Sequence, residues 1–210
     1  MTSIDIPESV TSIGDYAFYG CSSLTSIAIP EGVTSIGVWV FSGCSSLTSI
    51  DIPEGVTSIE NSAFSGCSSL KSVHITDLSA WCKITFSNSS SNPLYYAEKF
   101  YLNNEELTEL TIPADIKLIK NYAFYGYKAL TKVTMGEGVT SVGIHSFREC
   151  SSLTQVYCYG TTPPTINPSS TNSSFNGSKD GRTLYVPKGY LSAYQSSDWA
   201  SDFGTITEMD

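Results

Sequence analysis

A step of 23 residues runs through most of this 210-residue chain and constrains its fold more than any other feature. Each step carries an Ile-Pro pair, a Phe, a Cys and a Leu. The first steps place them at Ile6, Ile29 and Ile52; Phe18, Phe41 and Phe64; Cys21, Cys44 and Cys67; and Leu24, Leu47 and Leu70. The pattern returns at Ile112 and again at Met135, in the same frame. We therefore expect a repeat solenoid, in which units of fixed length stack on their neighbours.

Within one step, the apolar residues predict a strand, a turn and a return path. Ile27 and Ile29 occupy alternate positions on either side of the small Ala28, as expected for a half-buried strand. Pro30 and Gly32 then favour a turn. The apolar residues that follow, up to Phe41 and beyond, recur every three to five positions, which suits an irregular or short-helical return path. Stacked coils would bring their strands ~4.8 Å apart in a parallel sheet.

One coil is longer than the others. Ile112 follows Ile75 by 37 residues, which is 14 more than the regular step. The Ser- and Asn-rich residues 87–92 predict an exposed loop inside it. Residues 100–102 and 107–112 flank Asn-Asn-Glu-Glu, which predicts a strand, a tight turn and a second strand that rejoins the ladder. We expect an enlarged coil at about 75–112 and not a linker between domains.

The repeat ends near residue 160, where Thr162-Pro163-Pro164 breaks the coil. Residues 183–186 predict a last strand, and the apolar residues after it have spacings that suit a short helix. These are Tyr190, Leu191, Tyr194, Trp199 and Phe203. Because an open end of a stack exposes apolar core and strand edges, we expect this helix to cover it. The predicted organisation is a solenoid at 1–160 and a C-terminal cap at 161–210.

Charge excludes two classes of partner. The formal net charge is −9, and the eleven Lys and Arg residues form no basic run. Nucleic acid and anionic membrane surfaces are therefore not expected to bind. No apolar stretch approaches the ~20 residues that cross a bilayer, so no membrane insertion is expected. The N-terminal residues show no secretory signal and begin inside a repeat, which predicts a fragment of a longer parent.

The cysteines follow the repeat. Four of the six hold one position of the step, and Tyr127 fills the same position in another coil. A position that accepts tyrosine needs volume and not a thiolate, which favours buried, unpaired thiols over zinc or disulfides. Cys82 and Cys158 lie outside this position and have no clear role in the sequence. The four are Cys21, Cys44, Cys67 and Cys150.

Other candidate chemistry has a plain structural explanation. His74 and His145 have no acidic partner at a motif spacing, and no nucleophile elbow, phosphate loop or EF-hand loop is present. Glu8, Glu31 and Glu54 should align along one edge, where one carboxylate per coil favours a solvated edge over a calcium site. Tyr16, Trp39 and Tyr122 share a position on the return path, where partly buried packing is favoured over a second contact stripe. We expect no catalytic residue, no metal site and no cofactor.

The recurring Ile-Pro-Glu-Gly-Val-Thr-Ser-Ile-Gly-x-x-x-Phe-x-Gly-Cys-Ser-Ser-Leu-Thr-Ser-Ile text resembles the BspA-like, or Treponema pallidum-type, leucine-rich repeats of bacterial surface proteins. The resemblance covers nearly the whole chain, including 77–82, 91–94 and the C-terminal Leu184-Tyr185-Val186-Pro187-Lys188-Gly189 segment. It implies a right-handed leucine-rich-repeat coil, mainly β, with short helical turns on the return path and a C-terminal capping helix. It also implies an extracellular or cell-surface location.

The strand positions that face outward change chemistry from coil to coil, whereas the inward ones do not. As a set they form the extended surface that solenoids use for recognition. For any single residue, drift of an exposed position is the better explanation. The predicted function is a non-catalytic protein-binding or adhesion module, with a protein on a host or neighbouring cell as partner. The alternative is a glycan-recognising accessory domain, which aromatic rows along one face would support. The residues predicted to bind are Asp51, His74, Thr111, Lys132 and Tyr157.

Overall fold

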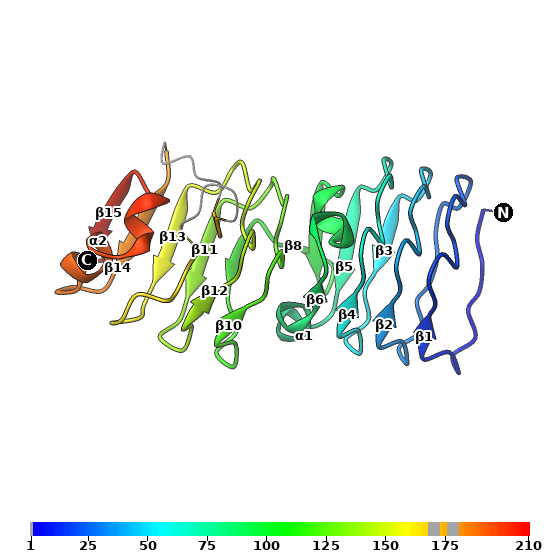
Figure 1. The fold of residues 1–210 in the computed structure, drawn as a ribbon, viewed down its shortest axis with the longest axis horizontal. Helices are drawn as coiled ribbons and strands as arrows, with labels where there is room; N and C mark the ends of the chain where they lie inside the picture. The colour runs from blue at the N-terminus through cyan, green and yellow to red at the C-terminus, as the bar shows by residue number, and fades with distance from the viewer. Residues whose placement is uncertain (1, 168–172, 176–180) are drawn as a thin grey trace. The chain divides into compact units, whose positions relative to one another are not determined.

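The computed structural model describes residues 2–167, 173–175 and 181–210. The chain divides into two compact units, unit 1 up to Leu107 and unit 2 from Thr108. Each unit is a stack of coils, and each contains two sheets (Figure 1). We call the sheet of the Ile-Pro strands the main sheet and the sheet of the return path the return sheet.

In unit 1 the main sheet has the order β3 (Ser49–Asp51), β5 (Ser72–Ile75), β7 (Lys99–Leu102), β8 (Glu105–Glu106). β3, β5 and β7 are parallel, and β8 pairs antiparallel with β7. The return sheet consists of the parallel strands β1 (Ser12–Ile13), β2 (Ser35–Ile36), β4 (Ser58–Ile59) and β6 (Thr85–Phe86). The helices of this unit all follow β5. They are α1 (Leu78–Lys83), η1 (Ser89–Ser91) and η2 (Pro93–Tyr95).

In unit 2 the main sheet is parallel throughout, with the order β15-β14-β13-β11-β9. Its strands are β9 (Glu109–Thr111), β11 (Lys132–Met135), β13 (Gln155–Cys158), β14 (Thr183–Val186) and β15 (Thr205–Glu208). The return sheet pairs β10 (Leu118–Ile119) with β12 (Ser141–Val142). Among the described residues of this unit, the helices are α2 (Leu191–Gln195) and η3 (Asp198–Ser201).

The 23-residue step is the register of the stack. The N–H of Thr34 donates to the carbonyl of Thr11 at 2.9 Å, and the N–H of Thr57 donates to that of Thr34 at 2.9 Å. Threonine is repeated here for a second reason, because the Thr57 hydroxyl also donates to the Thr34 carbonyl, at 3.1 Å. The predicted stacking of equivalent residues is therefore confirmed within each unit.

The core of each unit is a column of phenylalanine rings. The Phe41 ring lies 5.2 Å from that of Phe64, and the Phe124 ring lies 5.4 Å from that of Phe147, centroid to centroid. All four side chains are fully buried. Each ring is covered by the equivalent ring of a neighbouring coil. A single coil therefore cannot bury its apolar face, whereas a stack of coils can.

The return path differs from the predicted short helical turns. It begins with a two-residue strand and continues through tight turns. Two backbone positions explain this, because Trp39 has φ 57° and Gly43 has φ 77°, and the equivalent Tyr16 and Gly20 have φ 60° and 70°. Residues in this left-handed region cannot continue a right-handed helix. In the part of unit 1 that the structure describes, α-helix occurs between the main-sheet strand β5 and the return-sheet strand β6 of the enlarged coil, as α1.

The enlarged coil is shorter than predicted. Ser72 pairs with Lys99, so the next strand of the ladder is β7, 27 residues after β5, and not the strand that ends at Ile112. Phe100 fills the inward place beside Val73 and is fully buried. Its ring lies 4.9 Å from that of Trp81 in α1. The extra residues of this coil therefore form a helix with its own contribution to the core.

The prediction of an exposed loop at 87–92 is wrong for most of the segment. Ser87 is exposed, but Ser91 and Asn92 are fully buried, η1 occupies residues 89–91, and Asn92 caps η2. The Asn88 side chain accepts from the N–H of Ser91, and the Asn92 side chain accepts from that of Leu94. Serine and asparagine are abundant here because they cap these helices, and composition alone does not distinguish capping from solvation.

The C-terminal segment contains the predicted strand at 183–186, but that strand is not the last. β15 follows it and pairs with β14 in parallel. The predicted helix is present as α2 and η3, separated at residues 196–197. Tyr194, Trp199 and Phe203 are buried, whereas Tyr190 is exposed. The indole N–H of Trp199 donates to the Pro164 carbonyl at 2.7 Å, so this segment is tied to the break in the repeat.

Candidate ligand-binding surface

The outward side chains of the main sheet in unit 1 form two columns. The register aligns Ser49, Ser72 and Lys99 in one column and Asp51, His74 and Tyr101 in the other. Asp51 and His74, which the sequence predicted to bind together, are direct neighbours on β3 and β5. Tyr101 is a third member that the sequence prediction missed, because the 23-residue step does not reach it.

His74 lies between two partners. Its ring stacks on the Tyr101 ring, with centroids 4.7 Å apart and planes inclined by 12°. Its Nε2 atom is 2.9 Å from the Ser72 hydroxyl. These contacts fix the imidazole in one orientation on an otherwise open sheet face.

Lys99 and Glu106 border this face. The Lys99 ammonium donates to the Glu106 carboxylate at 2.9 Å and lies 6.0 Å from the centre of the Tyr101 ring. The pKa of Lys99 is raised above its ordinary value, chiefly by the hydrogen bond to Glu106 and then by that to Tyr101. The pair orders the antiparallel turn from β7 to β8.

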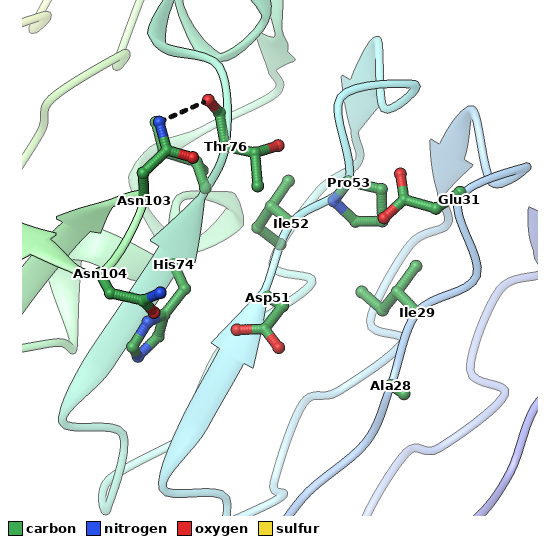
Figure 2. A pocket seen from close by; sticks show the side chains of 11 residues that line it. Ala28, Ile29, Glu31, Asp51, Ile52, Pro53, His74, Thr76, Asn103 and Asn104 are labelled. Carbon is green, nitrogen blue, oxygen red and sulfur yellow. Dashed lines mark hydrogen bonds between the residues drawn. The ribbon is translucent and has the colours of Figure 1, made fainter.

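A hollow of about 460 Å³ opens where strands β3 and β5 end (Figure 2). This volume is within the range of ligand pockets, about 300–1,000 Å³. Asp51 and His74 come from the two strands, and the turn after β7 adds Asn103 and Asn104 to the lining of the same hollow. The residues that line it are Ala28, Ile29, Glu31, Asp51, Ile52, Pro53, His74, Ile75, Thr76, Asn103 and Asn104.

The wall of the hollow formed by the Asn-Asn turn is well supported. Asn103 and Asn104 have φ 51° and 69°, a conformation that asparagine adopts more readily than most residues. The N–H of Asn103 donates to the Ile75 carbonyl at 3.0 Å, and its carboxamide donates to the Thr76 carbonyl at 3.3 Å. The Thr76 hydroxyl in turn donates to Glu54 at 2.6 Å.

The hollow is acidic. Asp51 and Glu31 contribute exposed carboxylates, and its lining contains no lysine or arginine. Glu8, Glu31 and Glu54 are all exposed, which confirms the predicted solvated acidic edge. Apolar walls of Ile52 and Pro53 complete a site that suits a ligand with both apolar and polar groups.

The main sheet of unit 2 carries a second group of outward residues. Thr111, Thr134, Tyr157 and Tyr185 align in one column. The rings of Tyr157 and Tyr185 stack with centroids 4.3 Å apart, inclined by 8°. Lys132 belongs to the other column, and its ammonium lies 5.3 Å from the centre of the Tyr157 ring and 3.3 Å from the Glu109 carboxylate.

The five residues predicted to bind are thus shared between the units. Asp51 and His74 lie in unit 1, and Thr111, Lys132 and Tyr157 in unit 2. Thr134 separates Thr111 from Tyr157 in the register. Residues that sequence reasoning missed are Tyr101, Asn103, Asn104 and Tyr185. For Tyr101 and Tyr185, the signal in the sequence was the alternation around Phe100 and around Leu184, which places these two residues on the outward face.

The repeated cysteines lie in the core, as predicted, except the first. Cys44, Cys67 and Cys150 are buried, and Cys21 is partly exposed because it belongs to the first coils of the stack. The Cys67 thiol donates to the carbonyl of Phe41 in the preceding coil at 3.2 Å. Burial raises the pKa of Cys44 to about 11 and that of Cys67 and Cys150 to about 12. Such thiols are poor nucleophiles near neutral pH.

Two other kinds of feature are absent from the part of the chain that the structure describes. Within the described residues, no group of three or more His, Cys, Asp or Glu side chains could hold a metal ion. Over the same residues, no helix has the length and apolar character needed to cross a bilayer.

Comparison with known proteins places the repeat in a family. The model of the BspA type leucine rich repeat region matches six copies, over residues 1–101 and 95–196. Comparison of the sequence with curated proteins gives no match.

Solved structures that match this chain include three bacterial proteins. The leucine-rich repeat protein TpLRR of T. pallidum is 24% identical with a TM-score of 0.46, over 74% of this chain and 68% of that one. The pneumococcal vaccine antigen PcpA is 16% identical with a TM-score of 0.44, over 100% and 42%. A leucine-rich repeat protein from Bacteroides ovatus is 22% identical with a TM-score of 0.46, over 98% and 59%. The family match spans most of the repeats described above, and the chain belongs to the BspA-type leucine-rich repeat family.

Proposed function

We propose that this chain is a non-catalytic protein-binding module, used in adhesion at the cell surface or outside the cell. The observation that carries the proposal is the contrast between the two faces of the main sheets. Inward residues such as Val73, Phe100 and Val133 are uniformly apolar and buried. Outward residues of the same strands mix acid, base and aromatic groups, and aromatic residues are enriched at protein interfaces.

The two outward surfaces supply the features of an interaction site. In unit 1 the hollow beside Asp51 and His74 can accept a protruding side chain of the partner. In unit 2 the Tyr157–Tyr185 pair with Lys132 offers ordered rings and a cation, and aromatic residues concentrate binding energy at interfaces. We assign recognition to Asp51, His74, Thr111, Lys132 and Tyr157, with Tyr101 and Tyr185 added from the structure.

The C-terminal segment supports this surface by closing the stack. We infer that residues 161–210 act as its cap, separate in role from the solenoid at 1–160. The buried hydrogen bonds from Trp199 to Pro164 and from Tyr194 to Gly160 join the two parts. A cap of this kind keeps the strands that carry Tyr157 and Tyr185 ordered.

The test is a binding screen of the full chain against purified animal extracellular-matrix proteins, followed by a triple substitution. Asp51→Ala, Lys132→Ala and Tyr157→Ala together should weaken binding to the protein identified by at least ~10-fold, or ~1.4 kcal/mol, without a large fall in melting temperature. The matched control changes one acidic residue, one lysine and one tyrosine at exposed positions outside the main-sheet strands, as Glu98→Ala, Lys188→Ala and Tyr159→Ala. Equal affinity of both triple variants would contradict the proposed surface.

A further inference from the structure

One position of the repeat has a left-handed backbone in every described coil where it occurs. Non-glycine residues at positive φ are uncommon, and bulky ones are outliers. Four of the five residues at this position nevertheless carry an aromatic ring. They are Tyr16 (φ 60°), Trp39 (φ 57°), Ser62 (φ 55°), Tyr122 (φ 60°) and His145 (φ 58°).

This backbone conformation is held by hydrogen bonds to the next coil, and the aromatic rings are not needed to hold it. The N–H of Tyr16 donates to the Val38 carbonyl at 2.9 Å, and the Asp15 carboxylate accepts from the N–H of Val38 at 2.7 Å. Ser62 has the same φ without a ring. The fold therefore does not require a ring here, and the strained position displays the rings that are present. Strain of this kind is concentrated at functional sites.

In unit 1 the rings of Tyr16 and Trp39, together with that of Tyr19, form a cluster that is open to solvent. The Tyr16 and Tyr19 rings have centroids 5.9 Å apart and are inclined by 69°. The Tyr19 and Trp39 rings are 6.2 Å apart and inclined by 62°. Tyr16 and Tyr19 are each 56% exposed, more than any other large hydrophobic side chain described, and Trp39 is partly exposed. The prediction that this position serves packing is therefore wrong for Tyr16.

The same cluster is built a second time in unit 2. The Tyr122 and Tyr125 rings are 5.9 Å apart and inclined by 60°, which repeats the Tyr16–Tyr19 geometry. His145 takes the place of Trp39, with its ring 5.2 Å from that of Tyr122 and 6.2 Å from that of Tyr125. Because the arrangement recurs in a separate unit, it does not depend on the position of Tyr16 and Tyr19 in the first coils.

Neutral polar groups continue the cluster in unit 1. The N–H of Trp39 donates to the Asn61 carbonyl at 3.0 Å, which places the two coils side by side. The Ser62 hydroxyl donates to the Asn61 carboxamide at 2.8 Å, and the Asn88 carboxamide donates to both residues. Carboxamides and hydroxyls both donate and accept hydrogen bonds, and they carry no charge.

We propose that Tyr16, Tyr19 and Trp39, with Asn61 and Ser62, form a binding site for neutral polysaccharides. We call these five residues the ring row. Sugar rings present apolar C–H faces that pack on aromatic rings, and their hydroxyl groups pair with carboxamides. The Asp15 carboxylate beside the rings accepts the Val38 N–H, and the five side chains of the ring row are themselves uncharged, which suits a neutral ligand. This site goes beyond the proposed protein-binding function and lies on residues of the return path, not on the main sheet.

The first test needs no substitution. Of the three tryptophans, Trp81 and Trp199 are fully buried and Trp39 is partly exposed, so iodide quenching of fluorescence reports on Trp39. The full chain is titrated with laminarin, mannan, xylan and dextran. We expect at least one of them to retard the protein in affinity electrophoresis and to protect Trp39 from iodide. Retardation by none of the four, or retardation without protection, would overturn the proposal.

The second test exploits the backbone strain. Asparagine tolerates the left-handed region, so Trp39→Asn and Tyr16→Asn remove the rings and leave a residue that adopts the same backbone conformation readily. The double variant should lose affinity for the polysaccharide at least ~10-fold, or ~1.4 kcal/mol, and keep its melting temperature within a few degrees. Tyr159→Asn, an exposed ring outside the row, is the control. Unchanged affinity of the double variant for the polysaccharide, or an equal loss of affinity in the control, would contradict the site. The triple variant of the main sheet tests the protein-binding surface separately.

Discussion

The hydroxyl of Tyr194 lies between the sulfur of Cys158 and the carbonyl of Gly160. It is 3.0 Å from the sulfur and donates to the carbonyl at 2.7 Å, in a fully buried setting. Burial raises the pKa of both Tyr194 and Cys158, so both groups are neutral. Cys158, which had no clear role in the sequence, is thus the point where β13 meets α2.

This contact predicts the effect of removing a single hydroxyl. Tyr194→Phe keeps the ring but leaves the buried Gly160 carbonyl without that donor, so we expect a loss of ~1–3 kcal/mol in the free energy of unfolding. Denaturant titration measures it. Tyr159→Phe, on an exposed ring, should change little, and a similar shift for both would mean that the contact does not stabilise the cap.

The phenylalanine column predicts a larger effect. Phe41→Ala leaves a cavity between the rings of Phe18 and Phe64, which neighbouring coils cannot close, at a cost of ~3–5 kcal/mol. Ser23→Ala, at an exposed position, should change the free energy of unfolding by a few tenths of a kcal/mol at most. Small and equal shifts would show that Phe41 does not face the core.

The cysteine column predicts accessibility. In native protein a thiol reagent should modify Cys21 first and leave Cys44, Cys67 and Cys150 unmodified, because these three are buried and their pKa values are raised. In denaturant all should react. Mass analysis of labelled peptides identifies the sites, and rapid native labelling of Cys67 would disprove its burial.

The same thiols predict a pH dependence of stability. Their folded pKa values, about 11 for Cys44 and about 12 for Cys67, lie above the ordinary 9.0. Between pH 9 and 11 the unfolded chain releases these protons while the folded chain keeps them, so stability must fall as the pH rises. Melting temperatures from pH 8 to 11 should decline, and the decline should be shallower in Cys67→Ala. An identical slope in that variant would contradict the linkage.

The short helices of the enlarged coil predict resistance to proteolysis. Asn88 caps η1 and bonds to Asn61 and Ser62 of the neighbouring coil, so residues 87–92 should resist cleavage despite their composition. Asn88→Ala should lower stability by ~1–2 kcal/mol through the lost cap and expose the segment to protease. Ser87→Ala, next to it on an exposed residue, serves as the control. Equal cleavage of the unaltered chain and both variants would mean that the segment is an ordinary loop.

Sequence by itself determined the coil. Ile, Phe, Cys and Leu at a fixed step of 23 residues can be buried together only if each coil lies on the next, so the parallel register of Thr11, Thr34 and Thr57 followed from the spacing. The same logic placed Asp51 beside His74 on the outward face. The periodicity carried this information because the burial of one coil depends on its neighbours in a repeating way.

Tertiary structure decided whatever departs from the repeat. The 27-residue coil that brings Tyr101 onto His74 has no counterpart with which a spacing could be compared, and Phe100 takes its place because it fits against Trp81 and Val73. The buried Ser91 and the exposed Tyr16 both contradict composition, because burial at a helix cap or at a left-handed position depends on local geometry as well as on residue type. The hollow beside Asn104 and the Tyr194–Cys158 contact arise in the same way, from segments that meet only after the chain has folded.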